Sequence, residues 1–214
     1  MLEVLRLTLG PLPNNVYLLA NPATQDAVVI DSSYEANAVL KKVSQHSWTL
    51  RQIWLTHAHF DHIAGAAEIA NAFEPSLPIG LHFEELNWYE NQGGAERFGL
   101  SIPQPPEPSI WFEHGMALTI TPGGEPPVIV RHAPGHSPGH VMFYCPSLGV
   151  LFCGDVIFRQ GIGRTDLPGG DMDILLRSIR EQVFSLPDET RLLPGHGPES
   201  TVGFERRNNP FFDL

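Results

Sequence analysis

Apolar and polar positions in the first third of the chain alternate in a way that predicts strands followed by a helix. Apolar runs at 2–9, 14–20 and 26–30 contain many β-branched and large side chains, and Gly-Pro and Asn-Pro pairs separate them, as is typical of strands. The segment Asp31-Ser32-Ser33 follows and offers caps for a helix that reaches Gln45, in which apolar residues recur at helical spacing. This region therefore predicts three strands and one amphipathic helix.

The next segment continues the alternation and ends in a proline-rich stretch. Residues 52–55 form a short apolar run that predicts a buried strand, and 63–73 is alanine-rich and predicts a short helix. A further helix is expected near 83–91. The sequence SIPQPPEPS at 101–109 contains too many prolines for either regular element, so it predicts a surface loop.

The second half of the chain is dominated by strand patterns. Strands are predicted at 110–112, 117–120, 127–131, 141–144, 150–153 and 191–193. A helix is expected over 173–183, and no sequence period indicates tandem repeats. Strands from both halves with helices between them predict two packed sheets flanked by helices, a layered α/β fold in a single domain over residues 1–214.

Composition narrows the class of protein. The 214 residues are 42% hydrophobic and 17% charged, which is typical of a globular protein, and no apolar run approaches the ~20 residues of a membrane span. The net charge of −11, without any lysine-rich or arginine-rich run, argues against nucleic acid or an anionic membrane as partner. The first residues lack the pattern of an export signal, so we expect a cytoplasmic protein in which Cys145 and Cys153 are buried thiols.

Ionisable side chains are concentrated directly after the predicted strand at 52–55. The sequence THAHFDH places His57, His59, Asp61 and His62 within six positions. Neutral imidazole and carboxylate groups are natural ligands of a divalent cation, and residues 57 and 59 project to the same side of an extended chain. Asp61 and His62 lie where the chain turns into the next helix and can face a second ion. The cluster therefore predicts metal binding.

Three further ligand-type residues each follow a predicted strand. His136 lies in APGHSPGH, Asp155 in CGDVIF and His196 in LLPGHGP. Because α/β folds place their chemistry at the carboxyl ends of strands, we expect these side chains to join the first cluster. With Asp155 able to bridge two ions, the other six form two sets: His57, His59 and His136, and Asp61, His62 and His196. Three nitrogens and a shared carboxylate leave one position for water, which is typical of a catalytic metal.

Together these motifs resemble those of the metallo-β-lactamase superfamily, over residues 14–210. The THAHFDH segment, the PGH turn, the GD pair after a strand and the late PGHGP occur in the order and spacing of that family. Within it the chain is most similar to the glyoxalase II (hydroxyacylglutathione hydrolase) branch, because PGHSPGH and GIGRTD match patterns of that branch. The resemblance implies an αββα four-layer sandwich with two divalent metal ions, for which zinc, iron and manganese all suit the ligands.

The reaction that this resemblance implies is hydrolysis of S-lactoylglutathione or a related acyl thioester. Two metal ions depress the pKa of bound water from 15.7 to roughly 7, and the bridging hydroxide so formed attacks the thioester carbonyl. Asp155 would bridge the ions, and Asp61 would fix the second ion and orient the nucleophile. The expected partner is therefore a small-molecule thioester, and the oligomeric state is left open.

Two residues near the ligands have other expected roles. The resemblance implies that Arg164 contacts a carboxylate of glutathione, whereas its spacing alone fits an ion pair with Asp166 or Asp171 equally well. His140 is interpreted as a hydrogen-bonding neighbour of the ligands rather than a ligand. Convergent partners are not expected for the remaining histidines, His46, His82, His114 and His132.

Other activities of the same superfamily are kept as alternatives. A persulfide dioxygenase has all seven ligand types and the GRTD loop, and it would use one iron at His57, His136 and Asp155. That family typically has cysteine where this chain has His140, which favours the hydrolase. A lactonase or β-lactamase would direct the same water at another carbonyl. Only 18 residues follow His196, so we expect a short form without the helical C-terminal domain of longer glyoxalase II enzymes.

Overall fold

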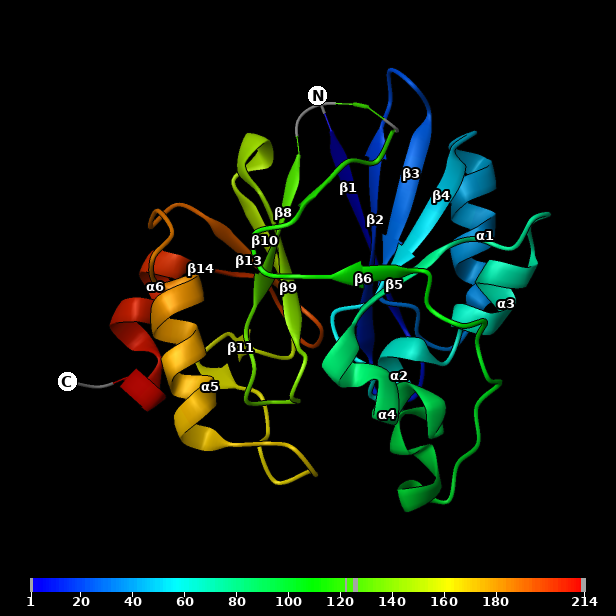
Figure 1. Ribbon diagram of the computed structural model, residues 1–214. Helices are drawn as coiled ribbons and strands as arrows, with labels where there is room; N and C mark the ends of the chain where they lie inside the picture. The colour runs from blue at the N-terminus through cyan, green and yellow to red at the C-terminus, as the bar shows by residue number, and fades with distance from the viewer. Residues whose placement is uncertain (1, 122, 125–126, 213–214) are drawn as a thin grey trace. The chain divides into compact units, whose positions relative to one another are not determined.

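The computed structural model describes residues 2–121, 123–124 and 127–212, which form two compact units. The first unit runs to Phe112 and includes the short segment that begins at Thr119, and the second holds Glu113–Leu118 and the chain from 127 onward. Each unit is built on its own six-stranded sheet (Figure 1). The predicted ligands are divided between the two units, since the THAHFDH segment lies in the first and the other three in the second.

The sheet of the first unit has the order β1-β2-β3-β4-β5-β6. Its strands are β1 (Glu3–Leu9), β2 (Asn14–Asn21), β3 (Asp26–Ile30), β4 (Thr49–Trp54), β5 (Ile79–His82) and β6 (Ile110–Phe112). The pairs among β1, β2 and β3 are antiparallel, and those from β3 to β6 are parallel. Parallel strands end at the same edge of a sheet, so the segments that follow β3 and β4 lie next to each other.

Helix α1 (Ala36–Gln45) follows β3 and is amphipathic, as predicted. Ala36, Val39 and Val43 are buried at helical spacing, and α1 lies beside β3 and β4 in Figure 1. The predicted cap is wrong, because Glu35 precedes the helix in a left-handed conformation and no side chain accepts a hydrogen bond there. The Asp31 side chain is used in the interior instead, as described below.

The alanine-rich segment forms two short helices, α2 (Phe60–Ile63) and α3 (Ala66–Asn71), where a single helix over 63–73 was predicted. Gly65 separates them. Its backbone lies so close to the chain after β3 that a Cβ atom at this position would be 2.2 Å from the Ser33 carbonyl oxygen. The early start of α2 places Asp61 and His62 on a helical turn.

The rest of the first unit consists of short helices and the expected proline-rich loop. The helices are η1 (Phe83–Glu85), α4 (Leu86–Glu90) and η2 (Gln92–Phe98). Residues 101–109 contain no regular element, as predicted. Strand β5 and helix η2 were not foreseen from the sequence.

The sheet of the second unit has the order β14-β13-β10-β9-β8-β7. Its strands are β7 (Ala117–Leu118), β8 (Val128–His132), β9 (Val141–Cys145), β10 (Val150–Gly154), β13 (Arg191–Pro194) and β14 (Ser200–Thr201), with the turn η3 (Pro146–Leu148) between β9 and β10. Strands β10 and β13 are parallel neighbours, and β8 is antiparallel to β9, which is antiparallel to β10. Strands β8, β10 and β13 therefore all point toward the same edge.

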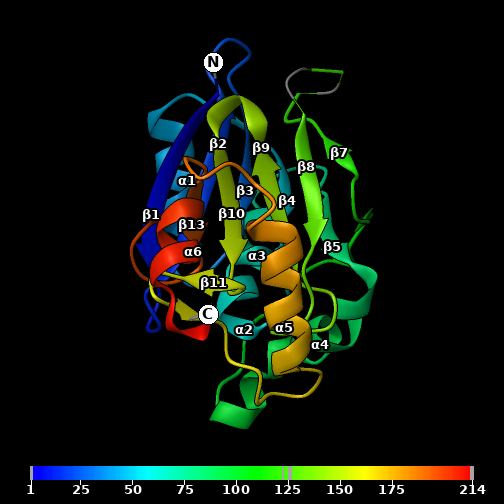
Figure 2. The same cartoon turned by 90° about the vertical axis from the view of Figure 1, so that its left-hand side faces the viewer.

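Helices cover one face of this sheet, as Figure 2 shows for α5 and α6 in front of β9, β10 and β13. Helix α5 (Met172–Ser178) continues into a π-helical turn, η4 (Ile179–Val183), which together match the helix predicted at 173–183. Leu175, Ile179 and Val183 pack in one apolar cluster with sheet residues such as Met142 and Leu151. This cluster is the hydrophobic core of the second unit.

Several small elements of the second unit were not predicted. Strands β11 (Ile157–Phe158) and β12 (Gly161–Ile162) form a separate two-stranded hairpin, and the chain after His196 folds into α6 (Val202–Asn208) and η5 (Pro210–Phe212). Cys145 and Cys153 are buried free thiols, as expected, and burial raises the pKa of Cys153. In the part of the chain that the structure describes, every helix is too short or too polar to cross a membrane.

Candidate metal centre

The THAHFDH segment gathers its ionisable side chains at the carboxyl end of β4. His57 and His62 are completely buried, and His59 and Asp61 nearly so. The ring centroid of His57 lies 4.7 Å from that of His59 and 4.1 Å from that of His62. His62 Nε2 lies 3.6 Å from an Asp61 carboxylate oxygen. The first unit therefore brings together all four residues that the sequence singled out in this segment.

A buried carboxylate that sequence analysis interpreted as a helix cap fixes two of these imidazoles. Asp31 Oδ2 accepts hydrogen bonds from His62 Nδ1 at 2.8 Å and from the Thr56 hydroxyl at 2.9 Å, and Oδ1 accepts from the Thr56 N–H. The Thr56 hydroxyl oxygen in turn lies 3.0 Å from His57 Nδ1 and accepts from it, since the hydroxyl hydrogen points to Asp31. Asp31 reaches this place because β3 and β4 are parallel neighbours.

The backbone between the two leading histidines is also held by an acidic side chain. Glu85 is fully buried and its carboxylate accepts a hydrogen bond from the Ala58 N–H at 2.8 Å. The His59 ring meets the edge of Trp88 at a centroid separation of 4.7 Å. Nothing in the local sequence marked Glu85 or Trp88, because both lie on short helices whose approach to residue 58 is a tertiary feature.

In the second unit the three remaining ligand candidates lie together at one edge of the sheet. Asp155 Oδ2 is 3.8 Å from His136 Nε2 and 3.6 Å from His196 Nε2. Asp155 follows β10 and His196 follows β13, and the Gly195 N–H donates to the Gly154 carbonyl at 2.8 Å, which ties the two strand ends together. The sequence prediction that residues after strand ends converge thus holds within this unit.

Hydrogen bonds orient the ligand candidates of the second unit. His136 Nδ1 donates to the Arg164 carbonyl oxygen at 2.8 Å, which puts the lone pair of the ring on Nε2. His140 Nε2 accepts from the backbone N–H of Asp155 at 3.0 Å. His140 thus contacts the backbone of a ligand candidate.

Glycines let the chain pass close to these residues. A Cβ atom on Gly163 would lie 1.9 Å from the Asp155 carbonyl oxygen and 3.0 Å from His136 Nδ1. Gly135 has φ +125°, and a Cβ atom there would lie 2.3 Å from the Leu175 backbone nitrogen at the start of α5. The site therefore needs glycine at 135 for space and for backbone conformation, and at 163 for space.

The donor set fits divalent metal ions. Separations of 3.6–3.8 Å between imidazole nitrogen and carboxylate oxygen are too long for hydrogen bonds but suit ligands of one ion, which lie about 3–4 Å apart when each is ~2 Å from the metal. His62 and His136 each donate through Nδ1 to an oxygen that only accepts, so the neutral form of each ring would offer the Nε2 lone pair to an ion. The chain thus carries a His/Asp set suited to a binuclear centre.

Arg164 lies on the exposed loop that follows β12 and makes a bidentate ion pair. Its Nε and Nη2 donate to the two carboxylate oxygens of Asp166, each at 2.7 Å. These hydrogen bonds lower the pKa of Asp166 to about 2 and raise the pKa of Arg164. Of the two partners that spacing left open, Asp166 is the one bound, while Asp171 accepts from the Ile174 N–H and caps α5.

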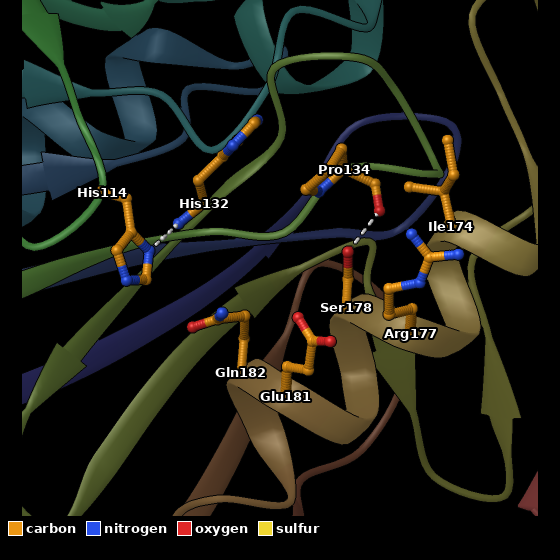
Figure 3. Close-up of a pocket in the computed structure, with 8 residues that line it drawn as sticks. All are labelled: His114, His132, Pro134, Ile174, Arg177, Ser178, Glu181 and Gln182. Atoms are coloured by element: carbon orange, nitrogen blue, oxygen red, sulfur yellow. Dashed lines mark hydrogen bonds between the residues drawn. The ribbon is translucent and has the colours of Figure 1, made fainter.

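A pocket in the second unit brings together two histidines for which no convergent partners were expected (Figure 3). Its lining residues are His114, His132, Pro134, Ile174, Arg177, Ser178, Glu181 and Gln182. The backbone N–H of His132 donates to His114 Nδ1 at 3.3 Å, and the Ser178 hydroxyl donates to the Pro134 carbonyl at 2.7 Å. The second bond holds the strand-to-turn segment just before His136 against α5.

Comparison with known proteins identifies the family. Residues 9–196 match the Metallo-beta-lactamase superfamily. The chain is 35% identical over 211 residues to the "Probable metallo-hydrolase YqgX" of Bacillus subtilis, covering 97% of this chain and 96% of that protein. It is 33% identical over 189 residues to "Hydroxyacylglutathione hydrolase GloC" of Haemophilus influenzae, covering 88% of each. Both likenesses extend across nearly the whole chain.

Solved structures agree with the sequence comparison. The BLEG-1 B3 metallo-beta-lactamase has a TM-score of 0.90 at 38% identity, with 98% of this chain and 99% of that chain covered. TTHA1623, solved in a di-iron-bound form, has a TM-score of 0.87 at 42% identity, with 97% and 99% covered. These scores confirm the fold class that the motifs predicted. The chain belongs to the metallo-β-lactamase superfamily and has its fold.

Proposed function

We propose that this protein is a metal-dependent hydrolase of acyl thioesters, with S-lactoylglutathione or a related compound as substrate. The observation that carries the proposal is the shared Asp155 carboxylate, which lies within 3.8 Å of two imidazole nitrogens, together with the three-histidine cluster of the first unit. Similarity to a hydroxyacylglutathione hydrolase and to a probable metallo-hydrolase supports it.

The proposed ligands are the seven residues identified from the sequence: His57, His59, Asp61, His62, His136, Asp155 and His196. Two divalent ions, when bound, would supply an activated water and polarise the substrate carbonyl. The Asp155 carboxylate would be shared, and Asp61 would complete the second set. Zinc is the first proposal for the metal, and the di-iron form of a relative makes iron the leading alternative.

The residues around the ligands would keep the site in one arrangement. Asp31 holds His62 through Nδ1, and the Arg164 carbonyl does the same for His136. Preorganised ligands need little rearrangement when the ion binds, and outer hydrogen-bond partners of this kind are typically worth 10–100-fold in metal affinity or activity. A thiolate is a good leaving group, so the reaction needs no strong general acid from these buried residues.

Recognition of glutathione is the finer part of the proposal. The Arg164 guanidinium would meet a carboxylate of the substrate, and Asp166 now occupies the same donors. A substrate carboxylate must therefore displace Asp166 or share the guanidinium with it. The reduced Cys145 and Cys153 are compatible with the cytoplasm, where glutathione is abundant.

Metal analysis combined with turnover of S-D-lactoylglutathione tests the proposal. We expect about two ions per chain, and His59→Ala or Asp155→Ala should lower both the metal content and the rate, the rate by about a hundredfold or more. His46→Ala is the matched control, because His46 is exposed and stacks on Trp48. Wild-type protein that carries two ions and leaves the thioester intact would contradict the substrate assignment.

A persulfide dioxygenase is the second candidate, and the relative solved with iron supports it in the kind of metal alone, because that relative holds two irons and the dioxygenase would use one. Oxygen uptake by iron-loaded protein with glutathione persulfide, measured beside thioester turnover, separates the two activities. An oxygenase rate near the thioesterase rate would favour the dioxygenase. The likeness to a B3 metallo-β-lactamase calls for a chromogenic β-lactam and a lactone in the same series of assays.

A further inference from the structure

The hairpin formed by β11 and β12, together with the two residues that follow it, lies next to all three ligand candidates of the second unit. It begins two residues after Asp155, and the ring of Phe158 lies 6.2 Å from the ring of His196. It leads directly to Gly163, which packs on the Asp155 carbonyl, and to the Arg164 carbonyl that orients His136. Its position therefore affects every ligand of this unit.

The hairpin is too small to define its own position. It has two residues in each strand, and its turn contains Gln160 with a left-handed φ of +57°. An isolated two-stranded hairpin is at best marginally stable in water, even with a more extensive ladder than this. Some other part of the fold must hold it in place.

The C-terminal helix α6 supplies that support through a buried carboxylate. Glu205 is fully buried, and its Oε2 accepts hydrogen bonds from the Gln160 N–H and from the Asn209 side-chain amide, both at 2.9 Å. Its other oxygen accepts from the Ser200 hydroxyl. The Asn209 amide also donates to the Gly161 carbonyl at 3.0 Å. Glu205 and Asn209 thus bind Gln160 in the hairpin turn and Gly161, the first residue of β12.

Burying a carboxylate is energetically unfavourable compared with burying an apolar side chain. Removing a carboxylate from water costs several kcal/mol unless hydrogen bonds replace the water, and an apolar side chain often gives equal or greater stability at such positions. Among the described residues, the Glu205 carboxylate accepts from the hairpin turn, from the residue that follows α6 and from the strand before that helix. The arrangement fixes the register and orientation of the turn, which apolar contacts would leave less defined.

We propose that Glu205, assisted by Asn209, is a positioning residue for the metal centre. It holds the β11–β12 hairpin so that the Arg164 carbonyl keeps His136 in the Nδ1–H form with Nε2 directed to the ion. The proposal rests on the proposed metal site, and it gives the segment after His196 a role within that site. Glu205 itself touches neither substrate nor metal.

The test compares Glu205→Gln with Glu199→Gln, which makes the same chemical change at a surface ion pair with Arg191. Zinc affinity is measured by competition with a coloured chelator. We expect Glu205→Gln to bind zinc about tenfold more weakly, at the lower end of the 10–100-fold range for outer hydrogen-bond partners, and Glu199→Gln to match the wild type. Equal zinc affinity in all three proteins would overturn the proposal.

A second readout works without metal. Long-range ¹H–¹⁵N spectra of the protein after its metal has been removed by a chelator report which ring nitrogen of His136 carries hydrogen. We expect Glu205→Gln to lose the spectrum typical of a ring protonated at Nδ1 alone. A purely structural role would lower the melting temperature and leave that spectrum intact, which counts against the proposal. If Glu205→Gln fails to fold, Asn209→Ala replaces it, with a loss of zinc affinity expected that is smaller than the ~10-fold loss for Glu205→Gln.

These readouts separate the two claims. A wild-type protein that binds neither zinc nor iron contradicts the proposed function, and the spectrum of His136 still decides whether Glu205 positions it. A wild-type protein that binds zinc and hydrolyses thioester, with Glu205→Gln and Asn209→Ala indistinguishable from it, keeps the proposed function and refutes the role of Glu205.

Discussion

Individual hydrogen bonds decide which ring nitrogen of each histidine would face a metal ion. His62 donates to the Asp31 carboxylate and His136 to a backbone carbonyl, so each ring carries its hydrogen on Nδ1 and its lone pair on Nε2. A negatively charged partner such as Asp31 also makes the imidazole a stronger base and hence a better ligand. The two rings reach the same state through different partners.

The Arg164–Asp166 pair gives a prediction at this scale. In the wild type the Asp166 carboxyl should titrate near the low pKa of about 2 that its hydrogen bonds with Arg164 produce, and in Arg164→Ala it should return toward the ordinary 3.8. Carboxyl chemical shifts followed by NMR across this pH range check the change. An unchanged titration of Asp166 would show that the ion pair does not persist in solution.

The sign of the effect on stability follows from the direction of this shift. Because folding depresses the pKa of Asp166, the contribution of the pair is complete above the unfolded pKa and is lost as pH falls from about 4 toward 2. The pair is exposed, so we expect this contribution to be small.

At the scale of elements, strand direction places the ligand candidates. Strands β10 and β13 are parallel neighbours, so Asp155 and His196 leave the sheet side by side. Strands β3 and β4 have the same relation in the first unit, which brings Asp31 to Thr56. Each unit thus uses the carboxyl edge of its own sheet.

The close passage of the chain at Gly163 gives a prediction for an element. Gly163→Ala places a methyl group 1.9 Å from the Asp155 carbonyl oxygen, so the loop must move away from both Asp155 and His136. We expect a loss of about 2–3 kcal/mol, or about 5–10 °C in melting temperature, together with weaker zinc binding.

Gly161→Ala, in the same hairpin, is the matched control for this substitution. The nearest atom to its added methyl group would be the Phe158 Cβ at 3.8 Å, an ordinary contact distance. Calorimetry and chelator competition on both variants make the comparison. Similar losses in the two variants would mean that neither glycine position tolerates a side chain, and that Gly163 has no special relation to the ligand candidates.

At the scale of the whole molecule, buried ionisable groups dominate the polar interior. Among the described residues, six of the seven proposed ligands are buried, and Asp31, Glu85 and Glu205 are buried with them. Buried charge of one sign is costly without partners, and divalent cations would offset much of the negative charge at the ligands. The folded state is therefore expected to depend on its metal.

Metal removal tests this dependence. A metal that binds only the folded state stabilises it by about 4 kcal/mol at a thousandfold excess over its Kd, so chelation should lower the melting temperature by roughly 10 °C in a chain of this size. Addition of zinc should restore the transition, and Asp155→Ala should melt at the same temperature with and without chelator. A chelated wild type that melts at the original temperature would argue against tight metal binding.

Much of the fold and of the candidate site could be predicted, because the signals for both are local. Apolar runs gave most strands to within one or two residues, and ligand-type residues just past those runs marked the candidate centre. Short elements such as β11, β12 and α6 were missed since their apolar content is too small for a pattern. The sequence likewise could not distinguish a cap from a ligand support at Asp31, because both roles favour aspartate after a strand.

The sequence by itself determined the family, the fold class and the proposed ligands, because a metal site requires particular side chains at particular spacings and those can be read along the chain. Tertiary structure alone decided which groups hold the ligands in place. Asp31, Glu85 and Glu205 act through hydrogen bonds to residues 25 to 45 positions away. Such contacts depend on strand order and helix packing, and no local pattern records them.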